Sequence, residues 1–69
     1  QEVDFILYGE RGLIAIEVKR AAKIRNQEFS GLKAFSKDYP QADLYMFYGG
    51  NKELFVNNIT ILPIKKALT

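Results

Sequence analysis

Two short segments of alternating residues, joined by a glycine-flanked turn, constrain the fold of this chain most. The first segment covers residues 2–8 and the second covers residues 13–19. Apolar side chains recur at every second position in both, and this period is typical of β-strands. The intervening Gly9-Glu10-Arg11-Gly12 favours a tight turn. The pattern predicts an antiparallel hairpin in which Tyr8 pairs with Leu13.

That register sets two carboxylates against each other. Counting back along the hairpin, Asp4 lies opposite Glu17, and Glu2 lies opposite Lys19. Directly opposed residues have Cβ atoms about 4.5–5.5 Å apart, so either one carboxyl group holds a proton or a cation lies between them. Mg²⁺ and Mn²⁺ prefer such oxygen ligands. Lys19 shares a face with Glu17 and is positioned to hold a phosphate or to orient an attacking water.

A simpler interpretation of the same residues stays open. Asp4 and Glu17 are equally consistent with solvated side chains on an open sheet face. Glu2 and Lys19 are equally consistent with an ordinary cross-strand ion pair.

The size and composition limit the chemistry. The 69 residues allow a single domain, residues 1–69, with a core of marginal stability. The chain has no cysteine and no histidine, which excludes disulfides, thiolate metal sites and histidine-based catalysis within it. A general base must therefore be a carboxylate, a lysine, a tyrosine or a metal-bound water. No apolar run approaches the roughly 20 residues of a membrane span, so we expect a cytoplasmic location and no membrane partner.

The charge is only slightly positive, at +2, but it is unevenly distributed. Arg20, Lys23 and Arg25 follow directly after Lys19. A basic segment beside an acidic metal site suits the binding of nucleic-acid phosphates. A solvated loop explains the same residues without any ligand, and this alternative also stays open.

The rest of the chain predicts a helix, a buried strand and a second hairpin. Asn26 is a candidate cap for a helix that ends before Pro40, and an apolar stripe along it predicts a core face. Residues 42–48 predict a buried strand parallel to the second strand. Residues 53–56 and 59–62 predict a hairpin around Asn57-Asn58, and Pro63 favours the start of a final helix. Gly49-Gly50 is expected to be a simple turn.

This order of elements resembles the PD-(D/E)XK superfamily, which has the restriction-endonuclease-like fold. The resemblance rests on Asp4 in the first strand and on Glu17-Val18-Lys19 in the second. It is closer still to a nuclease-like C-terminal domain of unknown function found in prokaryotic P-loop (AAA-type) ATPases. Those domains carry segments similar to residues 2–7 and 14–19, a helix similar to Gly31-Leu32-Lys33-Ala34-Phe35, and a close similar to Ile61-Leu62-Pro63.

The resemblance implies a role for each site residue. Asp4, Glu17 and the backbone carbonyl of Val18 would bind Mg²⁺ or Mn²⁺, and Lys19 would be the catalytic lysine. Glu2 would be a possible accessory acid, because it matches an acidic position that precedes the Asp in many relatives. The implied partners are nucleic acid, with DNA favoured, and the ATPase domain of the parent chain.

The implied fold is an α/β restriction-endonuclease-like core, in which a β-hairpin, a helix and a strand are followed by a C-terminal hairpin and the start of a final helix. The superfamily core begins with a helix and a strand that have no counterpart here, so the core is expected to be truncated on its N-terminal side. The chain begins without Met inside a strand pattern and ends inside a helical pattern. We therefore expect it to be a fragment of a longer chain.

Three functions are compatible with this sequence. The first is a metal-dependent nuclease module. The second is a catalytically inactive module that keeps the fold for DNA or partner binding. The third is an oligomerisation module, in which a second copy of the chain covers an open sheet edge to form a homodimer.

Overall fold

The computed structural model of the protein describes residues 3–68. Its strands are β1 (Phe5–Gly9), β2 (Gly12–Val18), β3 (Asp43–Tyr48), β4 (Leu54–Val56) and β5 (Ile59–Pro63), and its helical segments are the 3-10 turn η1 (Asn26–Phe29), α1 (Ser30–Asp38) and α2 (Ile64–Ala67). The strands form one mixed sheet in the order β1-β2-β3-β5-β4. The protein is therefore an α/β domain with the expected order of elements.

The first hairpin has the register that the sequence predicts. Tyr8 pairs with Leu13, and Gly9 pairs with Gly12, in antiparallel orientation. Gly12 has φ of 117°, a conformation that residues with a Cβ rarely adopt, which explains glycine at this end of the turn. The pairing ends with Phe5 and Ile16, so Asp4 lies directly before β1 and Glu17 is the residue of β2 that follows the last pair.

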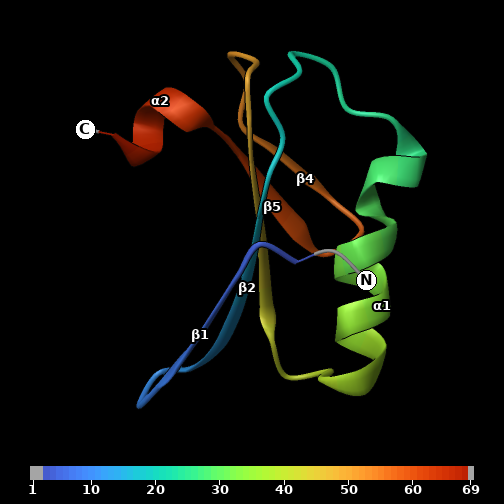
Figure 1. Ribbon diagram of the computed structural model, residues 1–69, viewed down its shortest axis with the longest axis vertical. Coiled ribbons are helices and arrows are strands. Elements are labelled where there is room, and N and C mark those ends of the chain that lie inside the picture. Colours follow the sequence, from blue (N-terminus) through green and yellow to red (C-terminus); the bar gives the residue numbers. More distant parts are fainter. Residues whose placement is uncertain (1–2, 69) are drawn as a thin grey trace.

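The connection from β2 to β3 determines where the helix begins. The two strands are parallel, with Val18 level with Phe47, so the chain must return across one face of the sheet between them. Figure 1 shows α1 along that face and α2 on the opposite side. As a result, η1 and the first turn of α1 lie at the end of the sheet where β2 stops.

The predicted helix cap at Asn26 is wrong. Asn26 is the first residue of η1, no side chain caps this segment, and the α-helix starts only at Ser30. A 3-10 turn is common before an α-helix and uses tighter i to i+3 hydrogen bonds. The N–H of Glu28 donates to the carbonyl of Arg25 at 2.9 Å, which satisfies a donor that a capping side chain would otherwise serve.

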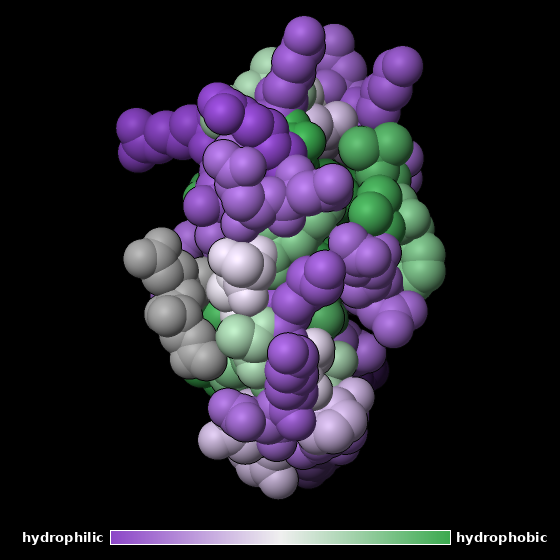
Figure 2. Space-filling model, turned by 90° about the vertical axis from the view of Figure 1, so that its right-hand side faces the viewer, coloured by the Kyte–Doolittle hydropathy of each residue, from purple (hydrophilic) through white to green (hydrophobic). Residues whose placement is uncertain are grey.

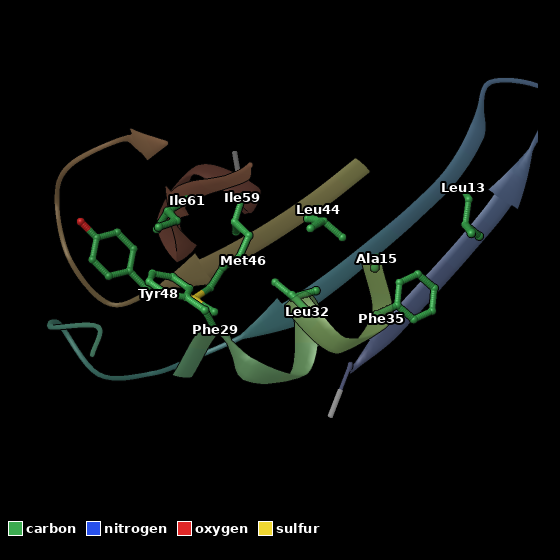
Figure 3. Packing of buried hydrophobic residues seen from close by; sticks show 10 residues of the cluster. All are labelled: Leu13, Ala15, Phe29, Leu32, Phe35, Leu44, Met46, Tyr48, Ile59 and Ile61. Atoms are coloured by element: carbon green, nitrogen blue, oxygen red, sulfur yellow. The ribbon is translucent and has the colours of Figure 1, made fainter. Parts of the chain in front are cut away.

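The core lies between α1 and the sheet. Side chains from η1 and α1 pack onto side chains from the three strands β2, β3 and β5, and Figure 3 shows this cluster: Leu13, Ala15, Phe29, Leu32, Phe35, Leu44, Met46, Tyr48, Ile59 and Ile61. The predicted apolar stripe of the helix is therefore core. Tyr39 at its end is largely exposed and stacks on Phe35 with 4.8 Å between ring centroids.

The two faces of the sheet differ. The α1 side carries mostly hydrophilic residues at its surface (Figure 2). Phe5 and Leu7 of β1 point to the other face, and they are 57% and 53% exposed. Phe55 of β4 is 69% exposed. Helix α2 contacts β3 and β5, so it does not extend over β1.

The turn predicted at Asn57-Asn58 is also confirmed, since these residues join β4 to β5. Asn57 and Asn58 have φ of 54° and 64°. Two successive positive φ values are typical of a type I′ turn, which matches the twist of paired strands. Asparagine tolerates this conformation better than other residues with a Cβ.

Gly49 is more than a simple turn residue, contrary to the prediction for Gly49-Gly50. Its N–H donates to the carbonyl of Ala21 at 2.9 Å, and a Cβ at this position would overlap the carbonyl oxygen of Arg20. The segment that follows β2 thus lies directly on the end of β3. Tyr48 fixes the other side of the turn, because its hydroxyl donates to the carbonyl of Lys52 and accepts from the N–H of the same residue.

We expect Gly49→Ala to destabilise the protein by about 1–3 kcal/mol, because the added methyl group must displace backbone atoms of Arg20. The measurement is urea unfolding followed by circular dichroism. Gly9→Ala is the matched control, since a Cβ there meets nothing within 4 Å. Equal unfolding free energies for the two variants would contradict the close approach at Gly49.

Candidate functional site

The end of β2 places a carboxylate inside the protein. Leu13, Ala15 and Glu17 alternate on the face that α1 covers, and Glu17 is only 3% exposed. It is the one charged residue that is buried among residues 3–68. A buried charge is costly unless it is paired and hydrogen-bonded, so the surroundings of Glu17 decide what the site can do.

Lys19 provides the partner. Its Nζ lies 2.8 Å from Oε2 of Glu17, and both side chains are shielded, with 29% and 5% exposed. The two residues share a face because they are two positions apart. The N–H of Lys19 donates to the carbonyl of Phe47 at 2.7 Å, which continues the pairing with β3 and fixes the backbone of the lysine.

The second carboxylate oxygen of Glu17 makes no hydrogen bond to the described residues. Oε1 is buried and has no hydrogen-bond partner within the described part of the chain. Buried polar atoms almost always have a partner, so this oxygen is suited to a ligand that brings a donor or a positive charge.

Asp4 lies beside this pair, on the β1 side. Its Oδ2 accepts a hydrogen bond from the N–H of Val18 at 2.8 Å. The Val18 carbonyl faces the same strand as its N–H, because both groups of one strand residue point to the same neighbour. The structure therefore places Asp4 against Val18 and Lys19 against Glu17 at the end of β2. Glu2 lies outside the described residues, and the role of these residues as a metal site stays a prediction.

The predicted nucleic-acid-binding residues lie in the segment that follows β2, outside the acidic site. Arg20, Lys23 and Arg25 are exposed along the connection between β2 and η1. Lys23 lines a separate hollow with Leu54 and Val56 of β4. The basic residues are thus accessible to a large ligand without contributing to the acidic site itself.

In a comparison with known families, residues 1–67 match DUF4143, which is described as a domain of unknown function. The chain belongs to the DUF4143 family. Among curated proteins and among solved structures, none matches it. The family description carries no activity, so the function of this DUF4143 domain has to be argued from its site.

One further acidic residue of the DUF4143 domain reaches the site and was missed by sequence reasoning. Glu28 of η1 lines the same cavity as Glu17 and Lys19, and its Oε1 is also buried without a hydrogen-bond partner. The sequence does hold a signal for it. Glu28 precedes the core residue Leu32 by four positions, and residues spaced by four share a helix face.

The residues present fit a hard divalent cation. Among residues 3–68 no three acidic side chains gather closely enough to form a ready metal site. Mg²⁺, however, is usually bound by one or two carboxylates and keeps several waters or takes phosphate oxygens. The unpartnered oxygen of Glu17 and the carboxylate of Asp4, which lies directly before β1, meet that lower requirement.

Within residues 3–68, no helix combines the length and the apolar character of a membrane span. This finding agrees with the absence of a long apolar run in the sequence. The cytoplasmic location stays a prediction.

We expect Lys19→Met to destabilise the DUF4143 domain by about 1–3 kcal/mol, because it leaves the buried carboxylate of Glu17 without its cation. The double variant Glu17→Met/Lys19→Met should regain most of that loss, since replacing both members of a buried ion pair is often neutral. Urea unfolding at neutral pH measures both. Lys33→Met, on the exposed side of α1, is the control and should change stability by less than about 0.5 kcal/mol. A Lys19→Met variant as stable as the control would show that Glu17 does not depend on the pair.

Proposed function

We propose that this DUF4143 domain is a metal-dependent nuclease-like module of the PD-(D/E)XK type, with a restriction-endonuclease-like core, that acts on nucleic acid. One observation carries the proposal. Glu17 is buried and ion-paired to Lys19 while its second oxygen has no hydrogen-bond partner, and Asp4, directly before β1, accepts a hydrogen bond from the N–H of Val18, the residue after Glu17. An arrangement selected for stability alone would not oppose two carboxylates at the covered end of a sheet.

Each residue has a role in this proposal. Asp4 and Glu17 bind Mg²⁺ or Mn²⁺ through the oxygens that are not committed to Val18 and Lys19, and the Val18 carbonyl faces the same place. When bound, the cation supplies Lewis-acid polarisation of a phosphodiester and activates water. The ammonium group of Lys19, held by Glu17, stabilises negative charge that develops on the phosphate.

The exposed basic segment supplies the contact with the nucleic-acid backbone. Arg20, Lys23 and Arg25 extend from the end of β2, next to Lys19, and are open to solvent. Contacts of this kind depend on salt rather than on base sequence. We favour DNA as the ligand, a prokaryotic parent chain with an ATPase domain, and a cytoplasmic location.

A second candidate is a catalytically inactive module that keeps this fold for DNA or partner binding. It is favoured by the fact that Asp4 and Glu17 each already commit one oxygen inside the protein, to Val18 and Lys19. In that case these two contacts only stabilise the end of the sheet and bind no ligand. The two candidates differ in whether a divalent cation binds.

The first experiment is a calorimetric Mn²⁺ titration of the wild-type protein and of Asp4→Asn. We expect saturable binding that weakens about tenfold or more in the variant, because a charged ligand is lost while the amide oxygen still accepts from the N–H of Val18. Asp43→Asn is the matched control, since Asp43 is exposed at the opposite end of β3. Equal affinities for Asp4→Asn and the control would remove Asp4 from the metal site.

The second experiment tests the basic segment with a charge-reversal variant, Arg20→Glu/Lys23→Glu/Arg25→Glu. We expect its affinity for duplex DNA to fall at least tenfold at low salt, with a smaller dependence on salt concentration, because fewer counterions are released. The control is Lys33→Glu/Lys37→Glu/Lys52→Glu, which reverses three exposed charges elsewhere. Fluorescence anisotropy across a salt series measures both. A control that loses as much affinity would show a merely general charge effect.

A further inference from the structure

Strand β1 forms one edge of the sheet and lacks the features that usually protect an edge. The order β1-β2-β3-β5-β4 leaves its outer side without a neighbouring strand among residues 3–68. Along that side, every second residue directs its N–H and C=O groups away from β2, where they can pair with a further strand. Charged residues, Pro and bulges normally prevent such pairing. The segment Phe5-Ile6-Leu7-Tyr8-Gly9 contains no charge and no Pro, and its pairing with β2 has no bulge.

The side chains of β1 are apolar or aromatic on both faces of the sheet, and they are exposed. Phe5 and Leu7, on the face opposite α1, are 57% and 53% exposed. Ile6 and Tyr8, on the α1 face, are 53% and 83% exposed. In the view of Figure 1, the tip of this hairpin lies at the opposite end of the molecule from α2. The edge is therefore apolar and open to a second strand.

A hollow of about 280 Å³ adjoins this edge on the α1 face. The lining residues are Val3, Ile6, Phe35, Asp38 and Tyr39. The wall is therefore mostly apolar and carries one carboxylate. It suits an aromatic side chain with a hydroxyl group, because the ring packs on the apolar wall and the hydroxyl donates to the carboxylate of Asp38. Tyr8 is such a side chain, but it does not line the hollow of its own chain.

We propose that β1 pairs with β1 of a second copy of this chain, antiparallel and in full overlap, about a two-fold axis at Leu7. In this register Leu7 faces its own counterpart, Ile6 faces Tyr8 of the second copy, and Phe5 faces Gly9 of the second copy. Facing residues lie an even number of positions apart in the chain, so outward-directed backbone groups of one copy meet those of the other. The two sheets become one continuous sheet, and the two-fold pairing leaves no free β1 edge for a third copy.

The side chains are complementary in this register. Tyr8 of the second copy lies opposite Ile6, so its ring enters the hollow that Ile6 lines, and its hydroxyl is directed to Asp38. Phe5 lies opposite Gly9 of the second copy, where a Cβ would meet nothing within 4 Å, so the ring has room above the glycine. An aromatic ring that covers a glycine of the neighbouring strand stabilises a sheet, as does the pairing of an aromatic with a β-branched residue.

The size and charge of the interface indicate a reversible dimer. An aromatic side chain has roughly 150–250 Å² of surface, so Phe5 and Tyr8 together expose about 200–350 Å² per copy. With Ile6 and Leu7, two copies bury on the order of 1,000 Å², which is the lower limit for a specific interface. No charge within β1 opposes the contact. We therefore expect a dissociation constant of about 1–100 μM.

The first test is sedimentation equilibrium of the wild-type protein, Leu7→Lys and Phe55→Lys at about 5–500 μM, with circular dichroism to confirm folding. The wild-type mass should rise with concentration from the 7.9 kDa of one chain towards that of a dimer. Leu7→Lys sets two lysines against each other at the two-fold axis, so the dissociation constant should rise about tenfold or more. Phe55→Lys is the matched control, because Phe55 is an exposed apolar residue of the other edge strand, and it should stay within about twofold of the wild type.

Two further variants should shift the affinity in opposite directions. Gly9→Val adds a side chain where the single chain has open space but the dimer holds Phe5 of the second copy, so the dissociation constant should rise about tenfold. Glu10→Lys should lower it about threefold or more, because residue 10 follows Gly9 and lies beside Asp4 of the second copy, where repulsion becomes attraction. Glu53→Lys makes the same change of charge in the exposed segment before β4, and this control should leave the dissociation constant unchanged.

A mixture of isotope-labelled and unlabelled protein tests the register directly. Isotope-filtered NMR should show NOEs between the ring of Tyr8 in one copy and the methyl groups of Ile6 in the other. Amide hydrogen exchange in β1 should slow as the protein concentration rises, because pairing protects the outward-directed N–H groups, whereas exchange in β4 should not change.

The outcomes decide the proposal. A wild-type protein that stays monomeric across this concentration range overturns it. A dimer that survives Leu7→Lys also overturns it, and loss of that dimer in Phe55→Lys would place the interface on β4. A dimer that Leu7→Lys and Gly9→Val weaken, with NOEs between Tyr8 and Ile6, supports pairing through β1. None of these measurements involves a metal ion or nucleic acid, so the proposed function is tested separately.

Discussion

The packing of α1 on the sheet is the contact on which the rest of this structure depends. Leu32 is fully buried at the centre of that contact, and the core residues of β2, β3 and β5 all lie on the same face. Because β2 and β3 are parallel, the covering helix has to start where β2 ends. The ends of parallel strands and the starts of the following helices are where ligands bind in α/β proteins. The crossover that completes the core therefore also brings Glu28 close to Glu17.

The Glu17–Lys19 pair is difficult to explain as a stabilising feature. A domain of this size has little stability in reserve, and a buried ion pair often contributes less than apolar side chains of similar volume. An apolar residue at position 17 would continue the row of Leu13 and Ala15 under α1. The chain instead buries a carboxylate and leaves one of its oxygens without a partner. This cost has a physical explanation if the oxygen binds a ligand, as the proposed metal site requires.

The two hairpins can be predicted from the sequence because the residues of their turns determine them. The glycines around the first turn set the register from Gly9–Gly12 to Phe5–Ile16, and Asn57-Asn58 forms the turn of the second hairpin. Other features depend on tertiary contacts. The sequence does not show that β5 rather than β4 pairs with β3, because either strand of a hairpin can meet a sheet edge. Gly49 is required by the backbone of Arg20, far earlier in the chain. The 3-10 turn that begins at Asn26, in place of the expected helix cap, is likewise not indicated by the local sequence.

The two carboxylates of the first hairpin have different environments, and this difference has a chemical consequence. Asp4 is exposed and anchored by a backbone N–H, whereas Glu17 is buried and anchored by a lysine. In both cases one oxygen is held, by the N–H of Val18 for Asp4 and by Nζ of Lys19 for Glu17, and this restricts the direction of the other oxygen. Such preorganisation lowers the entropy cost of binding an ion. It also means that a nuclease and an inactive binding module would share this geometry, and that what separates them is the occupancy of Oε1 of Glu17.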